Sequence, residues 1–443
     1  MTLAPQLRAA LCCLGALGFV LAAASPPGAA DGLAAARDVA PTPLVSTIHL
    51  GFGPSAVLMD EATGRAFVVG DGRGGVEVAV LNARTGRVVR VRSLGRSHLI
   101  PWQEGTPAAV DPGTGRVFLP TATGKPAGDG DPATGLCLVR VLDGRTGAQL
   151  RTIPAGYAPV GVTLAARARR LFLADGPRTD ALGRIIAPAG LRVIDVATGR
   201  LVRPPLPDEG LPLAVDDRIN RMFVGSSTGL DMLDAATGRV LARVPLGQAP
   251  DGGTAAATGL AVDERAGRVV VALSGSLGLT DGVVLDARTG RIVARAPSVG
   301  SGPLAADPST GRSMSVDYPL SSTGGPVTVS AFVTRDGRLV RMVTLDRLTS
   351  PGVVAAVAID TPSGRALIAR EQVIGAIAQP FTPTLLTVID MHSGRAVRGF
   401  ALDDQPPGSM FGAPSIAIDE RGRRAFVTNY GADTVTVLDL THL

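Results

Sequence analysis

The sequence is short of aromatic residues, lysine and cysteine, and each shortage excludes a class of protein. Aromatics make up 3% of the 443 residues, with one Trp and three Tyr, so few side chains could stack on nucleic-acid bases. Lys125 is the only lysine among 43 basic residues. The net charge of +5 therefore comes from arginines, many of which recur at one place in a repeated turn. We expect no nucleic-acid partner.

Only Cys137 lies outside the N-terminal region, because Cys12 and Cys13 fall inside its apolar segment. Residues 1–30 have the order of a signal peptide, with Arg8 first, an apolar run over 9–24, and small residues at 28–30. We therefore expect a secreted, periplasmic or cell-envelope protein without an internal disulfide, an uncleaved membrane anchor being the alternative. No later apolar run approaches about 18 residues, so no transmembrane segment is expected after signal removal.

After a linker over 31–43, the domain predicted over 44–443 consists of eight repeats. In seven of them an Asp precedes an Arg by five positions, as Asp60 precedes Arg65, and Ala165 and Arg170 keep this register in the other. Successive repeats start 44 to 59 residues apart. Each repeat contains two short turns, of which the first follows this Asp and the second spans segments such as 82–87 and 390–395. Alternating apolar runs on both sides of these turns predict four β-strands in each repeat.

The turns and the small residues together predict a β-propeller. An Asp or Asn at the first turn position can accept hydrogen bonds from its own turn, and Thr-Gly supplies the residue with positive φ. Alanine stands two positions before the repeat Asp in six of the eight repeats, which fits strands that converge on an axis. We predict an all-β propeller of four-stranded antiparallel blades, eight by count and seven if an insertion obscures one. The last repeat lacks a fourth strand, which the predicted strand 45–50 can supply.

The clearest repeat, residues 426–439, reads Phe-Val-Thr-Asn-Tyr-Gly-Ala-Asp-Thr-Val-Thr-Val-Leu-Asp. It resembles the YVTN family of bacterial β-propeller repeats, with Phe426 in place of the first Tyr. The resemblance extends from about residue 45 to the C-terminus, although only the last repeat carries Thr-Asn. It implies a WD-repeat-like propeller, related to the quinoprotein amine dehydrogenase-like superfamily, in an exported protein. Such propellers usually have seven blades and no assigned activity.

Antiparallel connectivity places both short turns of every blade at one end and all connections of variable length at the other. Function commonly lies in loops on a rigid scaffold, so we expect the binding site at this variable end and in the axial funnel beneath it. The chemically distinctive residues of these connections are the candidates for the site: His98, Trp102, Glu104, Asp129, Asp131, Asp175, Arg178, Asp180, Asp317, Tyr318, Arg370, Glu371 and Tyr430.

Two classes of function remain open. The first is a monomeric binding or scaffold module whose variable end takes a protein, glycan or small ligand. The second is a hydrolase or lyase of the lactonase-like or streptogramin-lyase-like kind, in which His98 would act as a base. The sequence has no serine-hydrolase elbow, no His-Glu-x-x-His and no paired cysteines, so we predict no catalytic set, metal or cofactor. A redox role would need a redox group from elsewhere.

Overall fold

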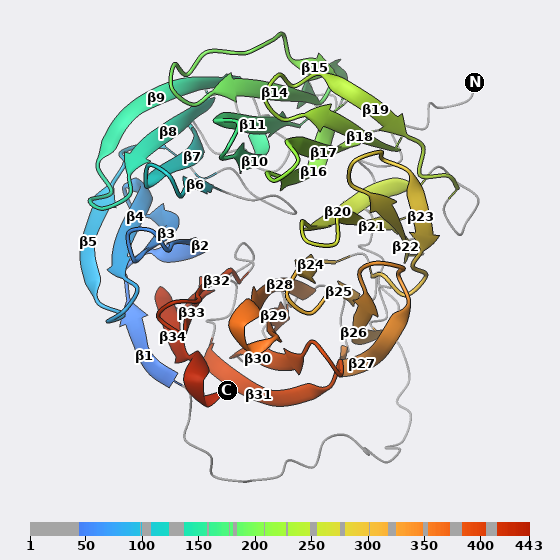
Figure 1. Cartoon of the computed structure of the whole chain (residues 1–443). Helices are drawn as coiled ribbons and strands as arrows, with labels where there is room; N and C mark the ends of the chain where they lie inside the picture. Colours follow the sequence, from blue (N-terminus) through green and yellow to red (C-terminus); the bar gives the residue numbers. More distant parts are fainter. Residues whose placement is uncertain are drawn as a thin grey trace, which may run out of the picture.

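A computed structural model describes residues 44–97, 99, 108–123, 137–156, 159–176, 178–179, 184–207, 209–226, 229–248, 255–274, 280–300, 302–317, 325–348, 353–372, 383–404 and 414–443. Across these residues the strands form eight four-stranded antiparallel sheets and one two-stranded sheet. The eight larger sheets are arranged radially around an axis, as Figure 1 shows. The chain is therefore an eight-bladed β-propeller, and the predicted fold class and blade count are confirmed.

The blades follow one another in chain order. Blade 1 comprises β2 (Gly53–Asp60), β3 (Arg65–Gly72), β4 (Gly75–Asn82) and β5 (Val88–Ser93). Blade 2 comprises β6 (Ala109–Asp111), β7 (Arg116–Ala122), β8 (Cys137–Asp143) and β9 (Gln149–Gly156). Blade 3 comprises β10 (Pro159–Ala165), β11 (Arg170–Asp175), β14 (Gly190–Asp195) and β15 (Leu206–Pro207). Between β11 and β14 lies the small sheet of β12 (Arg178–Thr179) and β13 (Ile185–Ala187).

The other half of the ring repeats this order. Blade 4 comprises β16 (Glu209–Asp216), β17 (Arg221–Ser226), β18 (Gly229–Asp234) and β19 (Val240–Val244). Blade 5 comprises β20 (Ala256–Asp263), β21 (Arg268–Ser274), β22 (Thr280–Asp286) and β23 (Ile292–Arg295). Blade 6 comprises β24 (Leu304–Asp307), β25 (Arg312–Asp317), β26 (Gly325–Val333) and β27 (Leu339–Leu348). Blade 7 comprises β28 (Val353–Asp360), β29 (Arg365–Gln372), β30 (Pro383–Asp390) and β31 (Ala396–Asp404).

Blade 8 joins the two ends of the described chain. It comprises β32 (Ile416–Asp419), β33 (Arg424–Asn429), β34 (Thr434–Asp439) and, as its outer strand, β1 (Leu44–His49). β1 pairs with β34 in antiparallel register, with Ile48 opposite Val435 and His49 opposite Thr434. The predicted closure by the first strand is confirmed. Two short 3₁₀ helices, η1 (Thr361–Ser363) and η2 (Leu440–His442), follow β28 and β34.

The short turns have the geometry that their sequence predicts. At the first turn of blade 1, Asp60 Oδ1 accepts a hydrogen bond from Ala62 N at 3.0 Å, and its Oδ2 accepts one from Thr63 Oγ1 at 2.7 Å. Gly64 then takes φ 63°. At the second turns, hydrogen bonds from the hydroxyls of Thr146 and Ser393 hold the pKa of Asp143 and Asp390 below their ordinary value.

Sequence departures leave this turn geometry in place. Three first turns have a residue other than glycine at the positive-φ position, where Arg169, Asn220 and Arg423 adopt φ of 52° to 57°. In blade 3, where Ala165 replaces the acid, Ala166 N donates to Asp217 Oδ2 of blade 4 at 3.0 Å. The same inter-blade bond occurs in turns that keep their own Asp, because Asp217 N donates to Glu264 and Glu420 N donates to Glu61. The bond therefore ties the turn of blade 3 to the next blade and does not replace the bonds of a head Asp.

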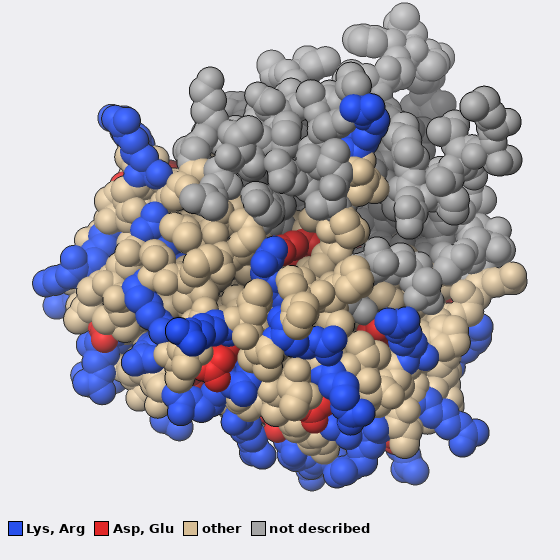
Figure 2. Space-filling model, turned by 90° about the horizontal axis from the view of Figure 1, so that it is seen from above, with Lys and Arg blue, Asp and Glu red and all other residues tan. Residues whose placement is uncertain are grey.

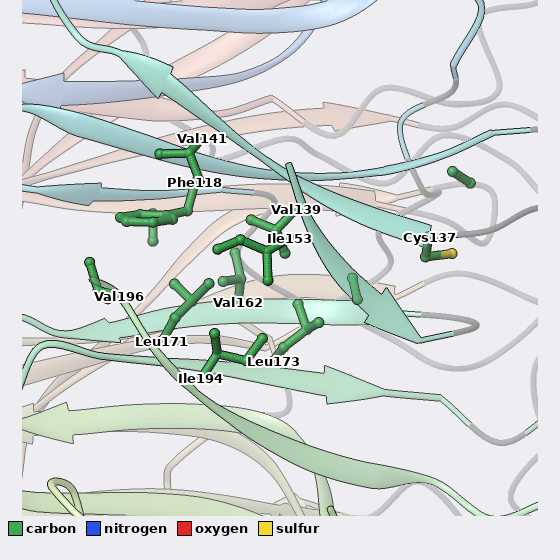
Figure 3. Close-up of a cluster of buried hydrophobic side chains, with 13 residues drawn as sticks. Phe118, Cys137, Val139, Val141, Ile153, Val162, Leu171, Leu173, Ile194 and Val196 are labelled. Atoms are coloured by element: carbon green, nitrogen blue, oxygen red, sulfur yellow. The ribbon is translucent and has the colours of Figure 1, made fainter. Parts of the chain in front are cut away.

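The hydrophobic core lies between the blades and not at the centre of the ring. Eight clusters of buried side chains occupy the described part, one at each contact between neighbouring blades. Figure 3 shows the cluster between blades 2 and 3, in which Phe118, Ile153 and Leu171 are fully enclosed. The alanines before the turns belong to this packing, because Ala417 of blade 8 lies among the larger side chains of Val57 and Met59 of blade 1. Blades can therefore approach closely at the axis.

Candidate functional site

The path of the chain gives the propeller two chemically different ends. The inner strand of each blade runs toward its Asp-headed turn, so both short turns of all eight blades lie at one end, which we call the fixed-turn end. Every other connection lies at the opposite end, the variable end. The described strands therefore confirm the expected separation of constant turns from variable connections.

The structure describes some of the candidate residues and not others. His98, Trp102, Glu104, Asp129, Asp131, Asp180 and Tyr318 lie outside the described residues. The backbones of Arg178 and Glu371 belong to β12 and β29. The four candidates with described side chains, Asp175, Asp317, Arg370 and Tyr430, lie at or just beyond the ends of second strands in blades 3, 6, 7 and 8. The structure therefore places these four at the variable end but on different blades.

These positions belong to a larger ring of polar residues that sequence reasoning missed. Each first turn begins at the repeat Asp, or at Ala165 in blade 3, and the tenth residue after this turn head is polar in six blades. We call these six residues the polar ring: Thr121, Asp175, Ser226, Asp317, Arg370 and Asn429. Thr121 and Asn429 have no exposed surface, and Asp175 and Arg370 are exposed by 8% and 9%. Alignment of the repeats on their turn heads, with attention to polar residues inside apolar strands, is the signal that would have found them.

Asp175 is the most perturbed member of the polar ring. Its Oδ2 forms an ion pair with Arg192 Nε at 2.5 Å, while no hydrogen-bond partner reaches its buried Oδ1. Burial raises the pKa of Asp175 to about 6 and outweighs the charge and hydrogen bond of Arg192, which lower it. Burial, with Asp175 close by, also raises the pKa of the Cys137 thiol to about 11. This carboxyl can exchange a proton near neutral pH, whereas the thiol stays protonated.

Asp175, Arg192 and Cys137 form a cluster, the Asp175 cluster, that joins two blades. Cys137 opens β8 of blade 2, and Asp175 and Arg192 belong to β11 and β14 of blade 3. A Cβ on Gly156, at the end of β9, would lie 2.4 Å from an Arg192 nitrogen, so only a glycine lets the guanidinium rest against this backbone. Cys137 lies at one side of the hydrophobic cluster in Figure 3. The charged pair thus lies above an apolar blade contact.

Other members of the polar ring bond to third strands of their own blades. Arg370 donates to Thr387 Oγ1 at 3.0 Å, and Asn429 Nδ2 donates to Thr434 and Thr436 at 3.0 and 2.8 Å. The ring of Tyr430 lies against Gly53 of blade 1, where a Cβ would be 2.9 Å from it. Burial, together with Asp71 and Asp433, raises the pKa of Tyr430 above its usual value. The variable end therefore combines fixed polar groups from several blades.

A separate apolar cavity lies on the axis. Its volume is about 420 Å³, and its walls are residues 57–59, 108–110, 162–164 and 416–418 of blades 1, 2, 3 and 8. These residues immediately precede the turn heads, so the cavity lies toward the fixed-turn end. All of its wall residues except Thr163 are apolar. The described variable-end polar groups therefore do not line this cavity.

Two further classes of site have no support in the described chain. No group of three or more His, Cys, Asp or Glu side chains there is arranged to hold a metal ion. Likewise, none of the helices in the described ranges has the length and hydrophobicity needed to cross a bilayer.

Comparison with known proteins supports the fold only. No protein-family profile and no curated protein matches the chain. Among solved structures, Saccharomyces cerevisiae Sqt1 has a TM-score of 0.56 at 11% identity, covering 90% of this chain and 99% of that one. The Dos1 propeller has a TM-score of 0.53 at 12% identity, covering 90% of this chain and 94% of that one. Dihydro-heme d1 dehydrogenase NirN has a TM-score of 0.50 at 15% identity, covering 80% of this chain and 67% of that one. At these identities the similarity shows the fold and nothing more: the chain is a β-propeller.

Proposed function

We propose that this protein is an exported, YVTN-type β-propeller that binds a partner through its variable end. The observation that carries the proposal is the contrast between the two ends. The described fixed turns keep one length, whereas the connections of variable length and the polar ring lie at the variable end. A scaffold of constant shape with changed connections at one end is the usual arrangement of a recognition surface.

The distribution of the polar ring favours a partner that spans several blades. Its members lie in blades 2, 3, 4, 6, 7 and 8, on both sides of the axis. Buried polar groups held by hydrogen bonds, such as Arg370 on Thr387, are pre-organised for binding. The buried members of this ring fix the shape of the variable end and are not themselves the contact surface, and a small ligand would cover only part of that end. A protein or glycan chain is therefore the partner class that fits best.

Affinity capture from the exported fraction tests this function. The bait is the full-length protein, compared with a variant in which the connection 373–382 is replaced by a scrambled sequence of equal composition. The matched control changes Arg421→Ala at the fixed-turn end, where the side chain of Arg421 is exposed. We expect the scrambled variant to lose a partner that the control retains. A partner lost only by the control would refute binding at the variable end.

Export is tested separately from binding. Residues 1–43 fused to a reporter should direct it out of the cytoplasm, and Edman sequencing of the mature protein should place the cut near residue 30. A reporter that stays in the cytoplasm would refute export but would leave the binding surface untouched. A reporter that is exported without cleavage would favour the anchored alternative.

The second candidate is a hydrolase or lyase at the variable end. Asp175 supports it, because a buried carboxyl with a pKa of about 6 is suited to acid–base chemistry near neutral pH. His98 remains the proposed partner base. A screen of lactones and esters with the wild type, Asp175→Asn and His98→Ala tests this candidate. Turnover that both substitutions abolish would support an enzyme, and no turnover by the wild type would favour the binding function.

A further inference from the structure

The second fixed turns present a ring of arginines at the fixed-turn end. These turns, which connect the third and fourth strands of the blades, carry ten arginines, and all ten side chains are exposed. We call this set the arginine ring: Arg84, Arg87, Arg145, Arg200, Arg239, Arg288, Arg291, Arg335, Arg338 and Arg395. It covers seven of the eight blades, and all of its members lie within the described residues.

The acids of the same turns do not present their charge in the same way. Five of these turns begin with an Asp, which is half-buried and accepts hydrogen bonds from its own turn, as Asp286 Oδ1 does from Thr289 N and Oγ1 at 3.0 and 2.9 Å. The other two begin with the uncharged residues Asn82 and Val333. Asp336 is the only exposed acid in these described turns. The arginines therefore extend beyond the carboxylates, and the outer part of this end is positively charged.

Exposed aliphatic residues accompany the arginines. Twelve large hydrophobic side chains of the described chain are exposed, and eleven of them lie on the outer strands or directly after these turns. The eleven are Val88, Val89, Val91, Leu150, Leu201, Val202, Ile292, Val293, Leu339, Met342 and Val397. Solitary exposed apolar residues need no explanation, but a recurring Arg–aliphatic sequence around a ring is a patterned amphipathic surface.

The propeller geometry arranges these groups for a flat partner. All second turns lie at one end of a radial ring, so their exposed arginines are distributed over that end on seven of the eight blades. Figure 2 shows Lys and Arg side chains projecting along the lower edge of the molecule, with few Asp or Glu between them. A broad ring of positive charges cannot converge on one small anion, but it can face an extended anionic plane.

We propose that the fixed-turn end docks on the surface of an anionic lipid bilayer. Arginines near such a surface attract its headgroups, and each adds about fivefold to the affinity within a Debye length of the surface. The neighbouring aliphatic side chains enter the boundary between headgroups and acyl chains, as on interfacial amphipathic elements. This orientation directs the variable end away from the bilayer. The proposal does not depend on which partner the variable end binds.

The test uses the full-length protein and vesicles of phosphatidylcholine, alone or mixed equally with phosphatidylglycerol. The key variant is Arg84→Ala/Arg288→Ala, which removes two charges from opposite blades. Alanine already occupies the same turn position at Ala197 and Ala236, so these turns fold without arginine. The matched control, Arg73→Ala/Arg96→Ala, removes two exposed arginines from the variable end.

We expect co-sedimentation with the mixed vesicles and not with phosphatidylcholine alone, decreasing as salt rises from about 0.05 to about 0.5 M. The Arg84/Arg288 variant should bind about 25-fold more weakly, and the control should bind as the wild type does. Val89→Thr/Val293→Thr should remove the binding that persists at high salt. Equal losses for the two arginine variants, or binding to soluble inorganic polyphosphate without binding to the mixed vesicles, would overturn the proposal.

Discussion

Replacing Asp175 by Asn should change the pH dependence of stability by a predictable amount. The side chain of Asp175 is exposed by 12%, and burial raises its pKa from 3.8 to about 6 despite Arg192. The folded state therefore binds this proton more tightly than the unfolded chain does. The contribution of Asp175 to stability is fully present below pH 3.8 and is lost as the pH rises through about 6.

A difference of about two pKa units corresponds to about 3 kcal/mol at about 1.4 kcal/mol for each unit. The free energy of unfolding of the wild type, minus that of Asp175→Asn, should fall by about 2 kcal/mol as pH rises from about 4 to about 7, and the rest of the change lies below about pH 4. Because both proteins share every other titrating group, this difference isolates Asp175. Above about pH 7 the difference should stay constant.

Urea unfolding followed by far-ultraviolet circular dichroism, at a series of pH values, measures this difference. Arg192→Gln provides a second arm, since loss of the cation should move the transition of Asp175 to higher pH. A difference that does not vary with pH, or that rises with pH, would show that the ion pair with Arg192 outweighs burial. In that case Asp175 would stay ionised at neutral pH, and its candidacy as an acid–base group would end.

Three other predictions concern the contacts that hold the ring together. Arg423→Gly removes two hydrogen bonds to the buried carboxylate of Asp360 across a blade contact, and should cost about 3 kcal/mol in urea unfolding, whereas Arg421→Ala, whose side chain is 77% exposed, should cost under about 1 kcal/mol. Gly144→Ala places a Cβ 1.9 Å from a backbone carbonyl oxygen and should lower stability by about 1–3 kcal/mol, while Gly74→Ala, whose Cβ meets nothing closer than 3.9 Å, should leave the melting temperature unchanged. Deleting β1 exposes the edge of β34, so sedimentation velocity should reveal more self-association for this variant than for the intact protein.

The sequence was sufficient for the fold because its signals are local and repeated. Asp-headed turns, glycines that can adopt positive φ and alternating strands recur in the same order from repeat to repeat. A repeat with a weak signal can therefore be assigned from its position relative to the others. Even the repeat headed by Ala165 was placed correctly from its register. The hydrogen bond that ties this turn to the next blade was not predictable, because its acceptor, Asp217, lies 51 residues further along the chain.

The site was less predictable because its chemistry depends on contacts between strands distant in sequence. Asp175 was a candidate from its loop position, but its partner Arg192 and the neighbouring Cys137 are brought to it by β14 and by blade 2. The sequence places Thr121 and Asn429 in variable connections, whereas in the structure they are buried at the ends of β7 and β33. Seven of the candidates lie outside the described residues and stay predictions.

The pairing of β1 with β34 also determines the order in which the molecule can fold. Each of the other blades is built from neighbouring segments and can form as soon as they are available. The closing ladder joins Ile48 to Val435, almost the whole described chain apart, so it must form last. Until then, β1 is a strand without a partner. Any factor that delays the arrival of the C-terminal segment therefore prolongs the stage at which the chain can pair with a second copy of itself.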